Sequence, residues 1–207
     1  MTDARAALVG AGYDAMGEAF AAWRDRIVGD PRHWWAEQLA SRLVDGADVL
    51  ELGCGSGVPV TRRLAERYRV TGVDISPKQV ERARAAVPGA EFVVGDFTAL
   101  EFTAASFDAV ASFYVFNHVP RDLLAPTFAR IRRWLRPGGY LLTALGVTDN
   151  PGWYGVFVGG ASYFSSFPPE VNRLLLHDGG FDLLLDEIVT FTEPEGEARF
   201  QWVLAQR

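Results

Sequence analysis

The sequence predicts an α/β protein built on a doubly wound, mostly parallel sheet. Strand-like and helix-like segments alternate from about residue 47 to residue 146, an order that is typical of parallel sheets with helices on both faces. One segment, residues 107–113, is almost continuously apolar, as expected of a strand covered on both sides. Another, residues 47–52, runs directly into a turn with glycines at positions 53, 55 and 57. Such a turn leaves main-chain atoms open to a flat, polar ligand.

We expect two helices before the first strand, over residues 13–28 and 31–44. Asp30 supplies an N-cap for the second helix, and Pro31 occupies its first position, where a backbone N–H is not needed. Apolar residues then repeat at four-residue spacing on one face of this helix, at Trp35, Leu39 and Leu43.

The alternating part of the chain contains five expected strands and three expected helices. The strands cover residues 47–52, 69–73, 90–94, 107–113 and 140–146, and the helices cover residues 59–67, 78–86 and 123–135. Ser76-Pro77 opens the second helix, and Val87-Pro88-Gly89 closes it. The turn at residues 136–139 ends the third helix, in which Pro126 is tolerated because it falls in the first turn.

The C-terminal part of the chain predicts one helix and a hairpin. The helix begins at Pro168-Pro169 and ends at Asp178, where Gly179-Gly180 stops it. Two strand-like segments, residues 181–191 and 198–206, flank a turn at Pro194-Glu195-Gly196. Because the turn is short, these segments should pair antiparallel.

Composition favours a single globular domain without a nucleic-acid or membrane partner. A chain of 207 residues with 49% hydrophobic content can bury a sizeable core, and no apolar run is long enough to span a bilayer. The first residues lack the pattern of a secretory signal, so we expect a cytoplasmic protein. The net charge of −6 disfavours binding to nucleic acid. The lone cysteine, Cys54, excludes an internal disulfide, and no metal site is readable.

The spacing of the glycines distinguishes two kinds of nucleotide site. A dinucleotide-binding loop needs G-x-G-x-x-G, whose third glycine lets the helix approach a pyrophosphate. Here the third glycine comes one residue early and Val58 and Pro59 follow it, while Glu51 would repel a phosphate but suit a cation. Asp74 lies seventeen positions beyond Gly57, where it would accept hydrogen bonds from ribose hydroxyls. The loop therefore favours a nucleoside that carries positive charge.

Four short motifs follow one another along the chain: E-L-G-C-G-S-G at Glu51–Gly57, G-V-D-I-S at Gly72–Ser76, V-G-D-F at Val94–Phe97 and L-R-P-G-G-Y-L-L at Leu135–Leu142. In this order they resemble the motif set of the Rossmann-like (class I) S-adenosylmethionine-dependent methyltransferases. The resemblance covers roughly residues 45–146. It implies a seven-stranded sheet with the C-terminal hairpin at one edge, and an N-terminal helical lid over S-adenosylmethionine.

On this resemblance, residues 1–207 form a single methyltransferase domain with four parts. Residues 1–45 would be the helical lid, residues 46–146 the cofactor-binding core, residues 147–169 an acceptor-binding insertion, and residues 170–207 the C-terminal helix and hairpin. Aromatic side chains near the two ends of the chain are compatible with a homodimer but do not require one.

Ligands of such sheets gather at the carboxyl ends of the strands, near the point where the strand order reverses. This rule and the resemblance select the expected cofactor contacts, namely Tyr13, Glu51, Gly53, Cys54, Gly55, Gly57, Asp74, Ile75, Gln79, Asp96, Phe97, Ser112 and Phe113. Tyr13 enters by resemblance alone, as a contact of the methionyl part. Cys54 is expected to be only a small residue in a tight turn.

Three acidic residues of this set have expected roles. Asp74 would bind the ribose through charge-assisted hydrogen bonds. Asp96 would accept from the adenine amino group, while Ile75 and Phe97 enclose the ring. Glu51 would either approach the ammonium group of the cofactor through water or orient the glycine loop by accepting from its amides.

Methyl transfer from a sulfonium requires an acceptor atom held about 3 Å from the methyl carbon, exclusion of water, and removal of a proton where the acceptor carries one. His118 is the candidate base, because it lies directly beyond the fourth strand and its ordinary pKa suits proton removal near neutral pH. The interpretation that we favour is that His118 hydrogen bonds locally and shapes this loop. The resemblance implies that little or no dedicated base is needed.

Two aromatic segments outside the motifs are expected to select the acceptor. One is the amino-terminal segment of residues 13–20 together with Trp23. The other follows the fifth strand and contributes Trp153, Tyr154, Phe157, Tyr163 and Phe164. Such rings would suit a flat or apolar small molecule. The alternative is that they only pack the lid onto the sheet.

The sequence thus predicts methyl transfer from S-adenosylmethionine to oxygen, nitrogen or carbon of a small molecule, mainly by positioning and desolvation. Two alternatives stay open: a catalytically inactive regulatory module that binds S-adenosylmethionine, and a nicotinamide-dependent oxidoreductase. The glycine spacing and the absence of a Tyr-x-x-x-Lys pair disfavour the oxidoreductase. The glycine loop and Asp74 support cofactor binding but do not establish the reaction.

Overall fold

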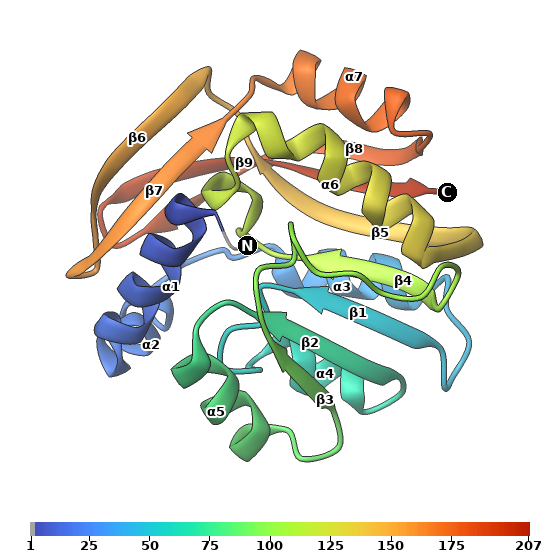
Figure 1. Cartoon of the computed structure of the whole chain (residues 1–207), viewed down its shortest axis with the longest axis horizontal. Coiled ribbons are helices and arrows are strands. Elements are labelled where there is room, and N and C mark those ends of the chain that lie inside the picture. The colour runs from blue at the N-terminus through green and yellow to red at the C-terminus, as the bar shows by residue number, and fades with distance from the viewer. Residues whose placement is uncertain (1–2) are drawn as a thin grey trace.

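The computed structural model describes residues 3–207, and its centre is one seven-stranded sheet (Figure 1). From one edge to the other, the strands are β3 (Glu91–Val94), β2 (Arg69–Asp74), β1 (Asp48–Leu52), β4 (Phe107–Ser112), β5 (Leu135–Gly146), β9 (Gly196–Gln206) and β8 (Asp182–Glu193). Neighbours from β3 to β5 pair in parallel, whereas β9 pairs antiparallel with both β5 and β8. The doubly wound, mostly parallel sheet with a C-terminal antiparallel hairpin is therefore confirmed.

Helices cover both faces of the sheet. The helices α6 (Arg121–Trp134) and α7 (Pro169–Asp178) lie on one face, and α3 (Arg32–Ala40) and α4 (Val60–Ala65) lie on the other (Figure 1). The helix α5 (Pro77–Ala86) packs on β2 and β3, and its N-cap is Ser76, as expected. No helix within residues 3–207 is both long enough and apolar enough to cross a membrane.

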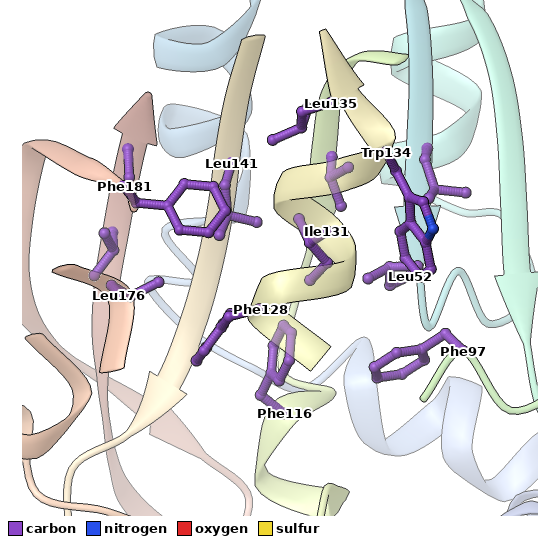
Figure 2. Packing of buried hydrophobic residues seen from close by; sticks show 14 of the residues in the cluster. Leu52, Phe97, Phe116, Phe128, Ile131, Trp134, Leu135, Leu141, Leu176 and Phe181 are labelled. Atoms are coloured by element: carbon purple, nitrogen blue, oxygen red, sulfur yellow. The ribbon is translucent and has the colours of Figure 1, made fainter. Parts of the chain in front are cut away.

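The larger apolar core lies between the sheet and the α6–α7 face (Figure 2). Phe128, Ile131 and Trp134 repeat along one side of α6 at helical spacing and are fully buried. The same cluster contains Leu52 of β1 and Leu141 of β5. Truncating one large core side chain typically costs about 3–5 kcal/mol. This packing therefore fixes α6 against the strands whose ends form the site.

The N-terminal helix differs from the expectation. Instead of one helix over residues 13–28, the chain forms α1 (Ala4–Met16) and α2 (Glu18–Arg24), separated by Gly17 at φ 56° and ψ −127°. The helix starts earlier than expected because the Asp3 carboxylate caps it by accepting from the amide of Arg5 at 2.8 Å. It breaks at Gly17 because other residues rarely adopt this backbone geometry.

A second sheet follows β5 and was not predicted. The strands β6 (Asn150–Phe157) and β7 (Gly160–Ser166) form an antiparallel hairpin outside the main sheet (Figure 1). Glycines and neighbouring aromatic residues interrupt the alternation of apolar and polar side chains that marks a strand in sequence. The aromatic segment after the fifth strand is therefore an ordered hairpin.

The helix α1 packs against β7 with almost no space between the backbones. A Cβ atom on Gly12 would lie 1.9 Å from the carbonyl oxygen of Ala161, and one on Gly160 would lie 2.5 Å from the carbonyl oxygen of Gly12. Residues of α1 and of the hairpin line the same cavity as the carboxyl ends of β1, β2 and β4. The two elements thus form one cover over these strand ends.

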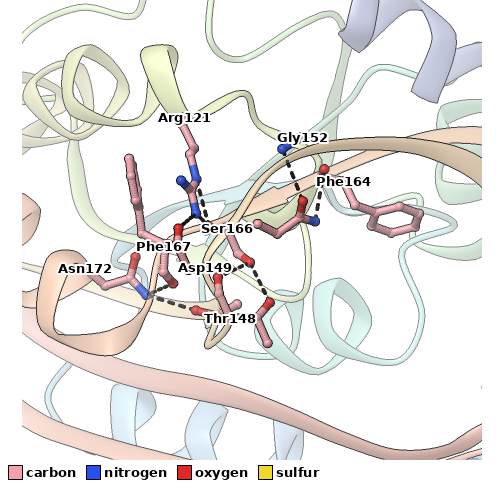
Figure 3. A network of polar contacts seen from close by, with 10 residues as sticks. Arg121, Thr148, Asp149, Gly152, Phe164, Ser166, Phe167 and Asn172 are labelled. Atoms are coloured by element: carbon pink, nitrogen blue, oxygen red, sulfur yellow. Dashed lines mark hydrogen bonds and ion pairs between the residues drawn. The ribbon is translucent and has the colours of Figure 1, made fainter.

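Polar contacts hold the base of the hairpin (Figure 3). The Arg121 side chain donates from Nε to the carbonyl oxygen of Ser166 at 2.8 Å and pairs with Asp149. The Asn172 amide on α7 donates to the carbonyl oxygens of Gly146 and Phe167, at 2.9 and 3.3 Å. These bonds engage the chain just before and just after the hairpin. The hairpin is therefore anchored to both α6 and α7.

We expect Gly12→Ala to push α1 away from β7, because the added methyl group has no space next to the Ala161 carbonyl. The expected loss is about 1–3 kcal/mol of unfolding free energy, measured by chemical denaturation, with faster proteolytic cleavage of α1. Gly89→Ala is the matched control, since a Cβ there meets nothing within 4 Å; its stability should stay within about 0.5 kcal/mol of wild type. Equal stability of the two variants would contradict the tight α1–β7 contact.

Candidate active site

The glycine loop at the end of β1 turns sharply onto β2. Gly53 has φ 70°, and a Cβ there would lie 2.6 Å from Cγ2 of Val115, so this position requires glycine. A Cβ on Gly55 would meet nothing within 4 Å, although Gly55 lines a cavity. The loop therefore leaves open space directly against its backbone, where a ligand can lie.

The amides of this loop are already hydrogen bonded. Gly53 and Cys54 both donate to the carbonyl oxygen of Val73, at 2.8 and 3.0 Å, and Gly55 donates to Oδ2 of Asp74 at 2.8 Å. A loop that binds pyrophosphate must instead point free amides at the phosphates. This arrangement disfavours a dinucleotide, as does the glycine spacing.

Asp74 ends β2 with each carboxylate oxygen bonded to one backbone amide. Oδ2 accepts from Gly55 and Oδ1 accepts from Ser76, at 2.8 and 2.9 Å. Each oxygen can accept a further hydrogen bond, because a carboxylate offers about four acceptor sites. Burial raises the pKa of Asp74 to about 6. Hydroxyl groups of a bound ligand would therefore stabilise its ionised form.

Asp96 presents a buried acceptor without a partner. Its Oδ1 accepts from the amide and the hydroxyl of Thr98, at 2.9 and 2.6 Å, whereas Oδ2 has no hydrogen-bond partner in residues 3–207. Ile75 and Phe97 line the cavity together with Asp96. An unpaired buried acceptor costs free energy. The site therefore fits a donor such as the exocyclic amino group of a flat ring.

Glu51 and Arg32 bring opposite charges to the same cavity. Glu51 is buried and accepts from Oγ1 of Thr61 at 2.6 Å. Burial raises its pKa to about 7, against the opposing effects of the Thr61 hydrogen bond and the Arg32 charge. The loop-orienting role considered for Glu51 is not observed, because the loop amides bond to Val73 and Asp74. An acid and a base together suit a ligand that carries both an ammonium group and a carboxylate.

His118 is buried in the short turn η1 (Phe116–His118) and is bonded at both ring nitrogens. Nδ1 lies 2.9 Å from the carbonyl oxygen of Tyr163, and Nε2 lies 3.1 Å from the hydroxyl oxygen of Tyr13. Because a carbonyl only accepts, Nδ1 carries the proton, and in the neutral ring Nε2 accepts from Tyr13. Burial lowers the pKa of His118 to about 4. The imidazole is thus neutral and a weak base near neutral pH.

A cavity of about 350 Å³ joins these groups to an aromatic compartment. We use this name for the part lined by Phe20, Trp23, Tyr114, Phe157, Phe164 and Phe200. Its rings come from the lid, from the β6–β7 hairpin and from the main sheet with the loop that follows β4. Trp23 and Phe157 stand edge to face with ring centroids 4.9 Å apart. The cavity thus has a polar part at the strand ends and an apolar part under the cover.

Most of the residues expected in the site line this cavity. They are Tyr13, Glu51, Gly53, Cys54, Gly55, Asp74, Ile75, Asp96, Phe97, Phe113, His118, Phe157 and Phe164. The remaining expected residues, Gly57, Gln79, Ser112, Trp153, Tyr154 and Tyr163, lie outside its lining.

The part of the chain that the structure describes contains no group of three or more His, Cys, Asp or Glu side chains arranged to hold a metal ion.

Several of the residues outside the lining have other partners. The Ser112 hydroxyl pairs with Oγ1 of Thr143 at 2.9 Å inside the sheet, and Gln79 is buried, with its backbone N–H donating to the Ser76 hydroxyl. Trp153 and Tyr154 are 52% and 63% exposed on β6. Both side chains are therefore largely exposed, although the Trp153 ring stacks on the ring of Phe164, with centroids 5.6 Å apart. Phe157 and Phe164 of the same hairpin line the cavity.

Several polar residues of the cavity wall, among them Arg32, Asn117 and Glu193, were not named as site residues in the sequence analysis. Arg32 opens α3, Asn117 lies beside His118 in η1, and Glu193 ends β8. Asn117 falls within the strand-end region that the topology rule selects, but nothing in the sequence separates it from its neighbours. Arg32 and Glu193 come from a helix start and an edge hairpin. No local pattern reveals that either segment folds back to the cavity.

Known proteins resemble this chain in both sequence and structure. Residues 49–139 match a family model described as a methyltransferase domain. The 2-methyl-6-phytyl-1,4-hydroquinone methyltransferase of Synechocystis sp. is 42% identical over 108 residues, which are 49% of this chain and 33% of that protein. This chain therefore spans about a third of the length of that relative.

Two solved structures share the fold. The 1,6-didemethyltoxoflavin-N1-methyltransferase of Burkholderia thailandensis, which holds 1,6-didemethyltoxoflavin and S-adenosylhomocysteine, superposes with a TM-score of 0.66 at 22% identity over 94% of this chain and 87% of that one. The [4+2]-cyclase SpnF superposes with a TM-score of 0.76 at 19% identity, over 98% of this chain and 96% of that one.

The fold, the ordered motifs and the match of residues 49–139 to a methyltransferase domain support a Rossmann-like (class I) S-adenosylmethionine-dependent methyltransferase. S-adenosylmethionine is the cofactor of this family. The cavity fits this molecule in three respects: open space against Gly55, an unpartnered acceptor at Asp96 Oδ2, and buried carboxylates at Glu51 and Asp74 that suit a cation.

We expect the affinity for S-adenosylmethionine to fall as the pH is lowered from 7.5 to 6. The pKa values of Glu51 and Asp74 are raised to about 7 and about 6, and the bound cation favours their ionised forms, so binding must release protons that are held at lower pH. The expected decrease is about fivefold or more. Calorimetry in two buffers of different ionisation enthalpy would measure both the affinity and the released protons.

Glu51→Gln is the matched variant for this experiment, because it keeps an acceptor for Thr61 and removes the titration near pH 7. Its affinity should be weaker at pH 7.5 and should change less between pH 7.5 and 6. An affinity that stays constant or rises on acidification of the wild type would show that these carboxylates do not bind the cation.

Proposed function

We propose that this protein transfers a methyl group from S-adenosylmethionine to a small-molecule acceptor, mainly by positioning and desolvation. The observation that supports this most is the cavity of about 350 Å³ itself, which joins a nucleoside-type site at the strand ends to an aromatic compartment under the cover. Methyl transfer requires two ligands to meet in one water-poor space. The cavity provides adjoining places for both.

The polar part of the cavity would hold the cofactor along its whole length. Asp74 would accept from the ribose hydroxyls, and Asp96 Oδ2 would accept from the adenine amino group between Ile75 and Phe97. Glu51 would face the ammonium group. Arg32, which the sequence analysis did not select, would face the carboxylate of the methionyl part. Each assignment pairs a donor of the cofactor with an acceptor of the chain, or the reverse.

The bound cofactor supplies a methyl group on a positively charged sulfur. The protein has to hold the nucleophile in line with that methyl group and keep water away, and positioning of this kind contributes roughly 7–11 kcal/mol in favourable systems. We expect α1 and the β6–β7 hairpin, which line the cavity, to limit the access of water to the aromatic compartment, whose rings would hold a flat or apolar acceptor in place. No strong base is required for an acceptor that is already nucleophilic.

Proton removal by His118 is restricted by its surroundings. The only nitrogen lone pair available for a proton lies on Nε2, and it accepts a hydrogen bond from the Tyr13 hydroxyl. Burial also lowers the pKa of His118 to about 4. A proton from the acceptor would therefore reach the imidazole only through Tyr13. These contacts support a positioning role for His118, with Tyr13 tied to the core by the same hydrogen bond.

Fold alone does not decide the reaction, because a [4+2]-cyclase shares this fold with a TM-score of 0.76. The curated relative and the N1-methyltransferase act, by their names, on a hydroquinone and on 1,6-didemethyltoxoflavin. These names support a small-molecule acceptor for this chain, at oxygen, nitrogen or carbon. A binding module without activity is the competing proposal, whereas the bonded amides of the glycine loop disfavour a nicotinamide-dependent oxidoreductase.

Incubation with S-adenosylmethionine labelled in the methyl group and a small-molecule extract of the source organism tests the proposal. We expect label in one or a few small molecules, detected by mass spectrometry, and none without protein. Binding of the cofactor without label in any product would favour the inactive module. Asp74→Ala, which removes the expected ribose contact, should abolish most of the labelling while leaving the protein folded.

We expect His118→Ala to keep turnover of the labelled acceptor within about fivefold of wild type, because a positioning role costs less than loss of a general base, which is worth about 100-fold or more. Tyr13→Phe, which removes the hydroxyl that bonds to Nε2, should behave similarly. The measurement is kcat as a function of pH for both variants. A loss of more than about 100-fold, together with the disappearance of one ionisation from the profile, would identify His118 as the base.

A further inference from the structure

One carboxylate of the cavity, Glu193, is left without a partner by the cofactor assignment. Glu193 ends β8 and lines the cavity next to the aromatic compartment. It is half-buried, and burial raises its pKa, as do the charges of Glu195 and Asp30. No hydrogen bond or cation of residues 3–207 counteracts these effects. Glu193 thus lines the cavity without a positively charged partner among the described residues.

The backbone around Glu193 is fixed to the lid. Val28 and Thr192 exchange two backbone hydrogen bonds, at 2.9 and 3.0 Å, which join the lid segment to β8. Two residues further on, the Glu195 carboxylate accepts from Nε1 of Trp23 at 3.0 and 2.8 Å. Glu193 lies between these two attachments. The main chain therefore cannot carry its carboxylate away from the cavity without breaking them.

The two arginines of the cavity wall have partners other than Glu193. The Arg32 guanidinium pairs with Asp30 and lies over the Tyr114 ring, 5.2 Å from its centroid. The Arg24 guanidinium donates to the carbonyl oxygen of Val58 at 2.8 Å and pairs with Asp25 at 3.1 Å. Neither cation is left to neutralise Glu193. The ligand itself must bring the positive charge.

A second unmatched acceptor belongs to the same cavity. Oδ1 of Asn117, beside His118, is buried and has no hydrogen-bond partner in the described chain. A cationic nitrogen that carries N–H groups supplies donors as well as charge. The faces of Trp, Tyr and Phe rings also attract cations, and such rings form the aromatic compartment. A neutral apolar ligand would leave the Glu193 carboxylate and Asn117 Oδ1 without hydrogen-bond partners, which costs free energy when water is displaced.

The cofactor contacts proposed above do not include Glu193. Glu51 and Asp74 suit its charge and its ribose, at the carboxyl ends of β1 and β2. Glu193 comes from the opposite edge of the sheet, with β9, β5 and β4 between β8 and β1. The Tyr13 phenol is close enough to both Asp74 and Glu193 for each charge to raise its pKa. The two ligands would therefore meet near Tyr13.

We propose that the methyl acceptor is a nitrogen-containing cation, a small molecule whose protonated amine sits against Glu193 among the rings of the aromatic compartment. This inference rests on the proposed methyltransferase function and defines its substrate class. It narrows the flat or apolar acceptor that the aromatic residues alone suggest. Glu193 acts here as a specificity-determining residue, and the atom that receives the methyl group need not be the cationic nitrogen itself.

The test uses the full chain saturated with S-adenosylhomocysteine and two probes of nearly equal shape, phenethylamine, which is a cation at pH 7.5, and 2-phenylethanol, which is neutral. We expect phenethylamine to bind at least about tenfold more tightly than 2-phenylethanol, because a desolvated charge pair is worth at least that much. Ligand-observed NMR titration measures both affinities. Equal binding of the two probes, or binding of neither at millimolar concentration, would overturn the proposal.

Glu193→Gln should bring the ratio of the two affinities close to one and leave the affinity for 2-phenylethanol unchanged. Glu197→Gln is the matched control, because Glu197 is exposed on the same hairpin and does not line the cavity; it should retain the preference for the amine. A preference that survives in Glu193→Gln also overturns the proposal. Titration of each protein with S-adenosylhomocysteine comes first, since absence of binding in the wild type would instead contradict the proposed function.

Discussion

The turn at Gly53 is the constraint on which the rest of the site depends. The amides of Gly53 and Cys54 both bond to Val73, and that of Gly55 bonds to Asp74. These bonds fasten the end of β1 to the end of β2, hold the Asp74 carboxylate in place and use up the donors that a phosphate would need. Because β1 lies where the strand order reverses, the ends of β2 and β4 flank the same opening.

The sheet was predictable because its signals are local. Buried parallel strands appear as apolar runs, and glycine, proline and serine mark their ends, as at Gly53 and Ser76. The break at Gly17 and the β6–β7 hairpin were not predicted. Both depend on contacts with distant parts of the chain, such as the approach of Gly12 to Gly160, that no short window of sequence contains.

The residues of the site also divide into those that the sequence predicted and those that it did not. Asp74 and Asp96 were found because they follow strands whose carboxyl ends must meet. Arg32 and Glu193 were not, since their place in the cavity follows from tertiary packing: Val28 must pair with Thr192 of β8 for Glu193 to line the cavity. The polar part of the cavity is thus encoded by motifs, whereas the aromatic compartment is formed by the way α1 and the β6–β7 hairpin fold back over the strand ends.

Because Gly12 packs directly against Gly160, α1 and the β6–β7 hairpin, which both line the cavity, are tightly joined to each other. We therefore expect α1 and the hairpin to move together when a ligand enters or leaves the cavity. A hairpin transplanted from another protein would fit against α1 only if residue 160 remained glycine. The positions of β6 that remain free to vary are exposed side chains such as Tyr154.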